Sequence, residues 1–404
     1  MRPGAVAAVA LAAALGGGIV SLLLADRTGL VDGSSTSTVV VRADGTEPIE
    51  QLLPGNGAKP LLGNGFDPAA IYRSRSAGVV TVYAYFDDRP DDHPPAQGSG
   101  FVVSKRGDIL TSSHVVTTAG SGERDPDGAS RVFVAFADGD RVPATLVGWD
   151  VYDDVAVLRV RPGAHRLDPV PLGDSSRVLV GKPVAAMGSP FGNENSLAVG
   201  VVSATHRSID SLTSDYTVAD AIQTDAPITH GNSGGPLFDA RGRVIGINAQ
   251  IRSESGQAEG VGFAIPINAA KRSFQGLVRD GRVAYAYVGV TAQDLTPSIA
   301  RRFSYTVSRG AVLACVVPGS PGADAGLRGG TRRHELNGFE FRHGGDVVVE
   351  IGNNKIGDAD DLVRVVSETL VPGQVARFTV LRDGRRLVVP VRLGERPKEP
   401  EARC

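Results

Sequence analysis

Ser233 lies in a segment of small residues, Gly231-Asn232-Ser233-Gly234-Gly235-Pro236. A serine hydroxyl becomes a nucleophile only when a base takes its proton, and acyl transfer also needs donors for the developing oxyanion. Small neighbours allow the backbone to turn sharply and to point successive N–H groups into one concavity, because glycine adopts strained torsions freely. A Gly-Ser-Gly cluster alone is usually an ordinary turn, so a catalytic Ser233 requires a base elsewhere in the chain.

The chain has seven histidines that could supply this base. His114 ends the run Ile109-Leu110-Thr111-Ser112-Ser113-His114, where an apolar strand can hold it rigidly, and we predict that it is the base. The other histidines with an informative context lie in polar loops, in the second half of the chain, or too close to Ser233 to face it: His93, His165, His334, His343 and His230.

A general base also needs a group that orients it and fixes its tautomer. Residues 149–158 contain three carboxylates that could do this. Asp154 alone directly precedes the apolar run of residues 155–160, where a buried carboxylate would need such a partner. Asp150 and Asp153 are predicted to be turn or cap residues.

Short strands must position these residues, because β-branched runs separated by turn residues fill the chain from residue 79 to residue 267. Hairpin-like turns are predicted at residues 137–141 and 239–243. Strands at this density favour an antiparallel barrel or sandwich over βαβ units. The predicted strands are residues 79–85, 100–104, 131–136, 155–160, 182–188, 198–204, 243–251 and 261–267.

The apolar period becomes helical over residues 266–280, and Gly281 follows as a stop signal. We place a domain boundary after this helix, so that one domain spans residues 68–281 and a second spans residues 284–395. The second domain mixes strands with one helix that begins near the acidic residues 358–361. It is predicted to be a small α+β module.

Composition excludes several classes of function. Lys+Arg 42 against Asp+Glu 44 gives a net charge of −2, so the chain lacks the basic excess of a nucleic-acid-binding protein. The two cysteines, Cys315 and Cys404, are too few for a disulfide framework or an all-cysteine metal site. We expect Cys315 to be a small buried hydrophobe rather than half of a bridge to Cys404.

Residues 5–25 form an uncharged apolar run, close to the ~20 residues that span a bilayer. Residues 1–27 are therefore predicted to contain a single transmembrane helix, with everything after it outside the cytoplasm. A cleaved signal peptide, which would secrete the protein, is the alternative, but the run is long for one and Leu23 would lie at the minus-three position. Residues 28–67 are predicted to be a flexible linker and residues 396–404 a disordered tail.

Taken together, these features resemble the HtrA (Deg) family of trypsin-like serine proteases. The order His114, Asp154, Ser233 is the order of that family. Other similar segments are residues 97–101, 154–158, 223–226, 231–239 and 260–266. The resemblance implies an all-β fold of two six-stranded antiparallel barrels, followed by a small α+β PDZ domain, in a membrane-anchored bacterial protein.

The resemblance implies that Ser233 is the nucleophile, His114 the general base and acid, and Asp154 its orienting carboxylate. The N–H groups of Gly231 and Ser233 would form the oxyanion hole. The implied activity is that of an extracytoplasmic serine endopeptidase acting on misfolded or specific envelope proteins, with no metal and no organic cofactor.

Two segments near Ser233 differ from related proteases. Digestive relatives carry an Asp at the place of Asn232, paired with a new N-terminus, so the neutral Asn232 argues against zymogen-type activation. Residues 228–230 depart from the family pattern close to the expected specificity pocket. This departure leaves the cleavage preference open.

Four residues of the second domain resemble the carboxylate-binding loop of a PDZ domain: Tyr287, Val288, Gly289 and Val290. In such loops N–H groups capture a peptide C-terminus while the peptide adds a strand to the sheet. The basic residues 331–343 are expected to be an inserted, solvated loop. The implied partners are polypeptide substrates, peptide C-termini, the membrane and, in a homotrimer, further copies of the chain.

Two functions of other classes compete with the protease. One is a peptide-binding sensor or chaperone whose protease domain is silent. The other is an esterase or acyltransferase on the same scaffold. An α/β-hydrolase is disfavoured because its order of residues is Ser, Asp, His, the reverse of the order here.

Overall fold

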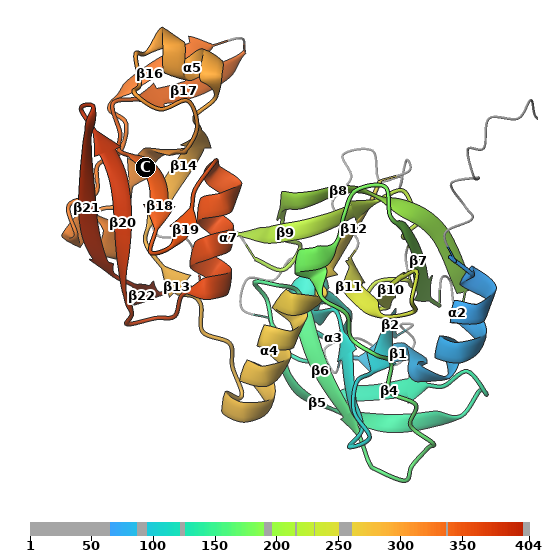
Figure 1. Ribbon diagram of the computed structural model, residues 1–404. Helices are drawn as coiled ribbons and strands as arrows, with labels where there is room; N and C mark the ends of the chain where they lie inside the picture. Colours follow the sequence, from blue (N-terminus) through green and yellow to red (C-terminus); the bar gives the residue numbers. More distant parts are fainter. Residues whose placement is uncertain are drawn as a thin grey trace, which may run out of the picture. The chain divides into compact units, whose positions relative to one another are not determined.

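The computed structural model describes residues 65–86, 95–121, 126–189, 196–214, 216–229, 231–249, 261–336 and 338–398. Two closed antiparallel barrels of six strands each form the first domain (Figure 1). The first barrel comprises β1 (Val79–Tyr85), β2 (Ala96–Val102), β3 (Asp108–Thr111), β4 (Arg131–Ala135), β5 (Arg141–Asp150) and β6 (Val155–Val160), in the order β1-β2-β3-β6-β5-β4. The second comprises β7 (Pro183–Gly188), β8 (Ser196–Asp210), β9 (Thr217–Thr224), β10 (Pro236–Asp239), β11 (Val244–Ala249) and β12 (Gly262–Pro266), in the order β10-β11-β12-β9-β8-β7. The predicted double barrel is confirmed.

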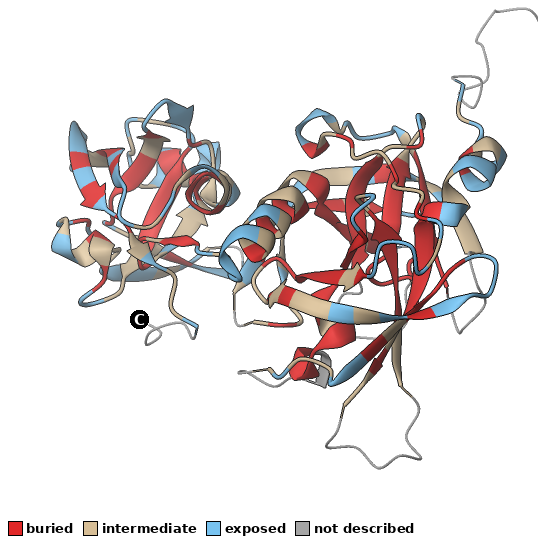
Figure 2. Cartoon of the chain, turned by 90° about the horizontal axis from the view of Figure 1, so that it is seen from below, coloured by how far each residue is buried: buried red, intermediate tan, exposed pale blue. Residues whose placement is uncertain are grey.

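Many residues of the barrel strands are buried, and Figure 2 colours these parts of the strands red. A third apolar cluster contains Phe101 and Leu110 of the first barrel together with Met187 and Phe238 of the second. Burial of such side chains contributes about 1.5–3 kcal/mol each. The shared cluster therefore holds the two barrels against each other, which fixes any site built from both.

Helix α4 (Ile267–Asp280) follows β12 and confirms the helix predicted over residues 266–280. Its C-cap Gly281 has φ of 70°, in the left-handed region that terminates helices. Leu277 lies on the buried face of α4, which packs against β5, β6 and β11. Gly148 of β5 lets the helix approach closely, since a Cβ there would lie 3.2 Å from a methyl group of Leu277.

A further helix, α2 (Pro68–Arg75), precedes β1 and was not predicted. Asp67 caps it by accepting the Ala70 N–H at 2.9 Å, and Pro68 occupies the first turn. Both are ordinary start signals of a helix. The helix is short, with Ile71 its one buried residue, so its apolar pattern is too brief to read.

The second domain is an α+β module with β14 and β21 at the edges of its main sheet. The sheet order is β14-β15-β18-β20-β21, and β19 pairs with β18. Asp358 caps the predicted helix α7 by accepting the Asp361 N–H at 2.8 Å. The elements are β13 (Ala286–Tyr287), β14 (Val290–Asp294), α5 (Pro297–Arg302), β15 (Ala311–Val316), α6 (Pro321–Asp324), β18 (Val347–Ile351), β19 (Asn354–Lys355), α7 (Ala359–Thr369), β20 (Val375–Arg382), β21 (Arg385–Arg392) and β22 (Gly394–Glu395).

Residues 331–343 are not the solvated loop that we expected. They form an antiparallel hairpin of β16 (Arg332–Leu336) and β17 (Phe339–His343). Phe303, which lies just after α5, stacks on Phe341 and His343 of β17. These ring contacts attach the hairpin to the domain and explain why a basic segment is ordered.

Cys315 is disulfide-bonded, so the expectation of a simple buried hydrophobe is wrong. The other cysteine of the chain, Cys404, lies outside the described residues. The prediction of a disordered tail is also wrong for Arg396 and Pro397, because the Tyr152 hydroxyl donates to the Pro397 carbonyl at 3.0 Å. Residues 399–404 lie outside the described ranges.

The predicted membrane segment, residues 1–27, and the linker up to residue 64 lie outside the described residues. Within the described ranges, no helix has both the length and the apolar character that crossing a bilayer requires.

Candidate active site

The pairing of β3 with β6 brings His114 and Asp154 together. Thr111 of β3 lies opposite Ala156 of β6. The short helix α3 (Ser113–Val116) follows β3 and carries His114, while Asp154 directly precedes β6. The predicted base and its orienting carboxylate therefore meet at one end of two neighbouring strands, although 40 residues separate them.

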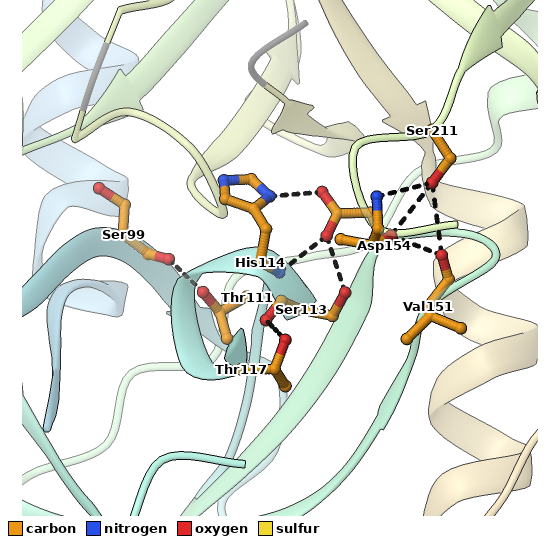
Figure 3. A network of polar contacts seen from close by, with 9 residues as sticks. Ser99, Thr111, Ser113, His114, Thr117, Val151, Asp154 and Ser211 are labelled. Atoms are coloured by element: carbon orange, nitrogen blue, oxygen red, sulfur yellow. Dashed lines mark hydrogen bonds and ion pairs between the residues drawn. The ribbon is translucent and has the colours of Figure 1, made fainter. Parts of the chain in front are cut away.

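Asp154 binds both the imidazole and the backbone of α3 (Figure 3). The Asp154 Oδ2 atom lies 2.7 Å from His114 Nδ1. Oδ1 accepts the His114 backbone N–H at 2.9 Å and the Ser113 hydroxyl at 2.8 Å. Because an ionised carboxylate only accepts, Nδ1 carries the proton and Nε2 is left to receive one from a serine.

Charge and burial oppose each other in this pair. Burial alone would lower the pKa of His114, but the charge of Asp154 and the hydrogen bond to it hold that pKa above its ordinary value. Burial would raise the pKa of Asp154, whereas the charge of His114 and the hydrogen bonds from His114 and Ser113 hold it below its usual range. The pair therefore favours imidazolium beside carboxylate, the state formed when a serine gives up its proton.

Ser233 lies in the loop between β9 and β10, and its buried hydroxyl has no hydrogen-bond partner in the described part of the chain. The Asn232 N–H donates to the Thr229 carbonyl at 3.0 Å, which closes a turn in which Gly231 has φ of 94°. A positive φ at this place of a turn favours glycine. Neither the Gly231 N–H nor the Ser233 N–H donates to another described residue. Both remain available to an oxyanion.

Ser99 of β2 joins this loop to the strand that leads to the base. Its backbone N–H donates to the Ser233 carbonyl at 2.8 Å, and its hydroxyl donates to the Gly231 carbonyl at 2.6 Å. The same hydroxyl accepts the Ser189 N–H at 2.9 Å. The Ser99 carbonyl accepts the Thr111 hydroxyl at 2.6 Å (Figure 3). Ser99 is fully buried and fixes two carbonyl groups of the nucleophile loop.

Sequence reasoning assigned no role to Ser99. Its segment, residues 97–101, was singled out only for its similarity to the family. The sequence shows only that Ser99 stands between two glycines, shortly before the strand that leads to His114. Its hydrogen-bond partner Gly231 is 132 residues away. No local pattern identifies a hydrogen bond of that separation.

Gly234 shows how closely the nucleophile loop approaches the base. Its φ is 85°, and a Cβ at this position would lie 2.3 Å from the Ser99 carbonyl oxygen and 2.8 Å from the Ser112 nitrogen. Only glycine fits both the torsion and the space. Ser112 is two residues before His114, so Ser233 and the base occupy the same small region.

Asn232 directs its amide nitrogen toward the Pro227 carbonyl, 3.4 Å away. Its Oδ1 atom is buried and accepts no hydrogen bond from a described residue. The side chain therefore makes no ion pair of the kind expected after zymogen cleavage.

The predicted carboxylate-binding loop lies between β13 and β14 and has its carbonyl groups occupied. The Val288 carbonyl accepts the Gly322 N–H at 2.7 Å, and the Gly289 carbonyl accepts the Val317 N–H at 2.8 Å. The N–H groups of Val288 and Gly289 donate to no residue in the described ranges. These free donors adjoin β14, an open edge of the sheet.

Among the described residues, no group of three or more His, Cys, Asp and Glu side chains lies together in a way that would hold a metal ion.

Asp150 and Asp153 were predicted to be turn or cap residues. Asp150 accepts the Tyr152 N–H at 3.0 Å and so caps the turn before Asp154. Asp153 lies within this turn, as predicted, and also forms an ion pair with Arg272 at 2.8 Å.

Comparison with known proteins agrees with this geometry. Residues 98–247 match the family described as trypsin-like peptidase domain, and residues 286–393 match the PDZ domain. A "Probable periplasmic serine endoprotease DegP-like" of Pseudomonas putida is 33% identical over 383 residues, covering 93% of this chain and 71% of the relative. The chain belongs to the HtrA/DegP family.

Other members of the family are similar to shorter parts of the chain. A DegP-like protein of Hahella chejuensis is 40% identical over 302 residues, which cover 75% of this chain and 58% of the relative. The chain thus spans about three fifths of the length of this curated relative. The solved structure of the HtrA-type protease AlgW with a tripeptide has a TM-score of 0.65 at 33% identity, covering 82% of this chain and 98% of the other.

Proposed function

We propose that this HtrA-family protein is a serine endopeptidase. The observation that carries the proposal is the His114–Asp154 hydrogen bond of 2.7 Å beside a nucleophile loop whose Gly231 and Ser233 N–H groups donate to no other described residue. These are the base, its orienting group and the oxyanion donors that acyl transfer requires. The named relatives, described as serine endoproteases, support the same activity.

In the proposed reaction, His114 Nε2 takes the Ser233 proton while Ser233 Oγ attacks the peptide carbonyl. The oxyanion forms between the Gly231 and Ser233 N–H groups. Imidazolium then gives its proton to the leaving amine, and water hydrolyses the acyl-enzyme with His114 again acting as base. Asp154 keeps the proton of His114 on Nδ1, so that each proton transfer takes place at Nε2.

One observation favours the silent sensor as an alternative. The Ser233 hydroxyl has no partner among the described residues, so its hydrogen bond to His114 is not formed in this state. Catalytic hydrogen bonds often form only when substrate binds, so the absence of a bond between the Ser233 hydroxyl and His114 also fits a resting enzyme. Labelling of Ser233 separates the two functions.

The decisive experiment is fluorophosphonate labelling of the purified ectodomain, with mass spectrometry to locate the adduct. We expect the adduct on Ser233, loss of labelling in Ser233→Ala, and cleavage of an unfolded protein by the wild type alone. Ester turnover without any protein cleavage would favour an esterase. A wild type that binds peptides but never labels would favour the sensor.

The second domain is proposed to bind peptide C-termini through Val288 and Gly289, with the peptide pairing to the edge of β14. Their unoccupied N–H groups support this proposal. The AlgW structures, solved with a tripeptide and with a decapeptide, provide a family precedent. We further propose that such binding regulates cleavage of polypeptide substrates.

We also propose that the catalytic domain lies outside the cytoplasm, anchored by residues 1–27, and that the chain assembles as a homotrimer. The apolar run of residues 5–25 supports the anchor, and relatives described as periplasmic support the location. Protease protection in spheroplasts tests the location. Sedimentation of the detergent-extracted protein tests the trimer.

A further inference from the structure

The catalytic carboxylate is held in an uncommon backbone conformation. Asp154 ends the turn of residues 151–154 that joins β5 to β6, and its φ is 51°. The left-handed region costs a residue with a side chain roughly 1–2 kcal/mol. Such a conformation persists only where neighbouring groups hold it. The side chains that secure this turn therefore control where Asp154 lies.

Asp150, the last residue of β5, is the main anchor of the turn. One carboxylate oxygen accepts the N–H groups of Tyr152 at 3.0 Å and Asp153 at 3.5 Å. The other oxygen accepts the Ser273 hydroxyl at 2.7 Å and the Tyr285 hydroxyl. Four donors thus converge on one side chain that is 3% exposed.

The two hydroxyl donors come from outside the barrel. Ser273 lies on α4, and Tyr285 lies in the segment between α4 and β13. Arg272, next to Ser273, forms the ion pair with Asp153 at 2.8 Å. Its guanidinium carbon lies 5.5 Å from the centre of the Tyr285 ring. Helix α4 and the connecting segment therefore hold both acidic residues of the turn.

The ionisation of these groups suits this role. Burial and the charge of Asp153 raise the pKa of Asp150 to about 6, although the bonds from Tyr285 and Ser273 act in the opposite direction. Burial and the charge of Asp150 raise the pKa of Tyr285 well above its ordinary value. At neutral pH the Tyr285 hydroxyl therefore keeps its proton and donates a hydrogen bond to the Asp150 carboxylate oxygen.

We propose that Asp150 and Tyr285 are positioning residues for Asp154, so that the segment leading into the PDZ domain is hydrogen-bonded to the turn that carries the catalytic carboxylate. This inference rests on the proposed function. If the inference is correct, a movement of the connecting segment displaces Asp150 through its hydrogen bond with Tyr285, and so displaces Asp154. Tyr285 itself does not contact the substrate.

Tyr285→Phe is the central test, because it removes the hydroxyl and keeps the ring over Arg272. Asp150→Asn is the second variant, since an amide has one accepting oxygen and cannot accept both the two hydroxyl bonds and the two N–H bonds of the turn. Tyr83→Phe on β1 is the matched control. We expect kcat per active site to fall about ten- to a hundredfold in the two test variants, with KM unchanged, because small displacements of catalytic groups have effects of this size.

The pKa of the His114 imidazole, followed by NMR titration, separates positioning from mere folding. Asp154 raises this pKa, so displacement of Asp154 should lower it in both variants and leave it unchanged in Tyr83→Phe. Folded Tyr285→Phe protein with wild-type kcat and wild-type His114 pKa would overturn the inference. An inactive wild type would contradict the proposed function instead, and the NMR titration would still decide the role of Tyr285.

Discussion

Asp154 binds three donors on α3: the imidazole, the His114 backbone N–H and the Ser113 hydroxyl. Loss of its charge therefore affects both the tautomer and the attachment of the helix. Ser99 has the corresponding place on the nucleophile side, where it binds the Gly231 and Ser233 carbonyls. Neither residue needs to react, yet each determines where a reacting atom lies.

Asp154→Asn tests the first of these roles. The amide stabilises the wrong tautomer of His114, so we expect kcat to fall by about 10⁴. The base acts only when neutral, and Asp154 raises its pKa, so the acid limb of the kcat/KM profile should move to lower pH in the variant. Rates of peptide hydrolysis, measured at intervals of about one pH unit from about pH 5 to about pH 9, give both kcat and the position of the acid limb. An unchanged acid limb would contradict the assignment of Asp154.

Ser99→Ala tests the second role. The change removes the two hydrogen bonds of the buried Ser99 hydroxyl and leaves the Gly231 carbonyl only its longer bond of 3.4 Å from the Ser189 N–H, and each lost bond costs about 0.5–1.5 kcal/mol of stability. Loss of an oxyanion donor lowers kcat by about 10²–10³, and we expect a fall of up to this size with KM unchanged. Ser130→Ala, an exposed serine, is the control. Equal kcat in the two variants would show that the loop keeps its shape without Ser99.

The residues that could be predicted from sequence were those with a local context. His114 follows an apolar strand and Asp154 precedes one, and the structure places both where these strands meet. Ser99 and Tyr285 could not be predicted, because their roles depend on partners 132 and 135 residues away. Long-range hydrogen bonds leave no periodic signal in the chain.

At the scale of elements, barrel closure overrides local preference. Strand β5 contains Pro143 and Gly148, residues that argue against a strand, yet it pairs with β4 and β6 over ten residues. Strand β9 mixes polar and small residues and was missed as well. Both strands are fixed by neighbours that complete the barrel, so their own sequences need only be compatible with pairing.

Gly289 is the position on which the peptide-binding element depends. Its φ is 76°, and a Cβ would lie 2.2 Å from the Ser320 Cβ. Gly289→Ala should therefore displace the loop and weaken binding of a peptide with a free C-terminus by at least about tenfold, measured by calorimetry. Gly352→Ala, with φ of 60° and open space around it, shares the torsional cost without the clash. Equal loss in both variants would contradict a specific role for the loop.

At the scale of the whole molecule, the charge of one carboxylate, Asp220 of β9, acts on another, Glu368 of α7. Burial and the charge of Asp220 raise the pKa of Glu368 on α7 to about 7, and the charge of Arg272 lowers it. A carboxyl whose pKa is higher in the folded protein binds extra protons there. Its contribution to the free energy of unfolding therefore falls as pH rises from its unfolded-state value toward about 7.

Glu368→Gln should remove this pH dependence. Relative to the wild type, the variant should gain stability as pH rises from 4.5 to about 7, and keep a constant difference above that range. Urea unfolding at a series of pH values measures the difference. Glu335→Gln, an exposed residue of β16, is the control for loss of a carboxylate at the surface. A flat difference for Glu368→Gln would mean that the carboxylate is solvated.

The double barrel and the PDZ domain could be predicted, because the short motifs that carry the family resemblance each lie within a few consecutive residues. The contacts of Arg396 do not: its guanidinium lies 5.0–5.3 Å from the ring centres of Tyr152, Tyr216 and Tyr285. Arg396 thus lies among three rings from different parts of the chain. Its charged, proline-containing sequence context had predicted a disordered tail. Cation–π contacts of this kind require the finished fold.

Trp149 is the one tryptophan of the chain, and it stands in β5 directly before Asp150. Its indole packs beside Gly128, where a Cβ would lie 3.0 Å from the ring. The protein thus carries a built-in optical probe at the base of the turn that holds Asp154. The emission of this single indole gives a label-free signal by which rearrangements of the turn can be followed in real time, without chemical modification of the chain.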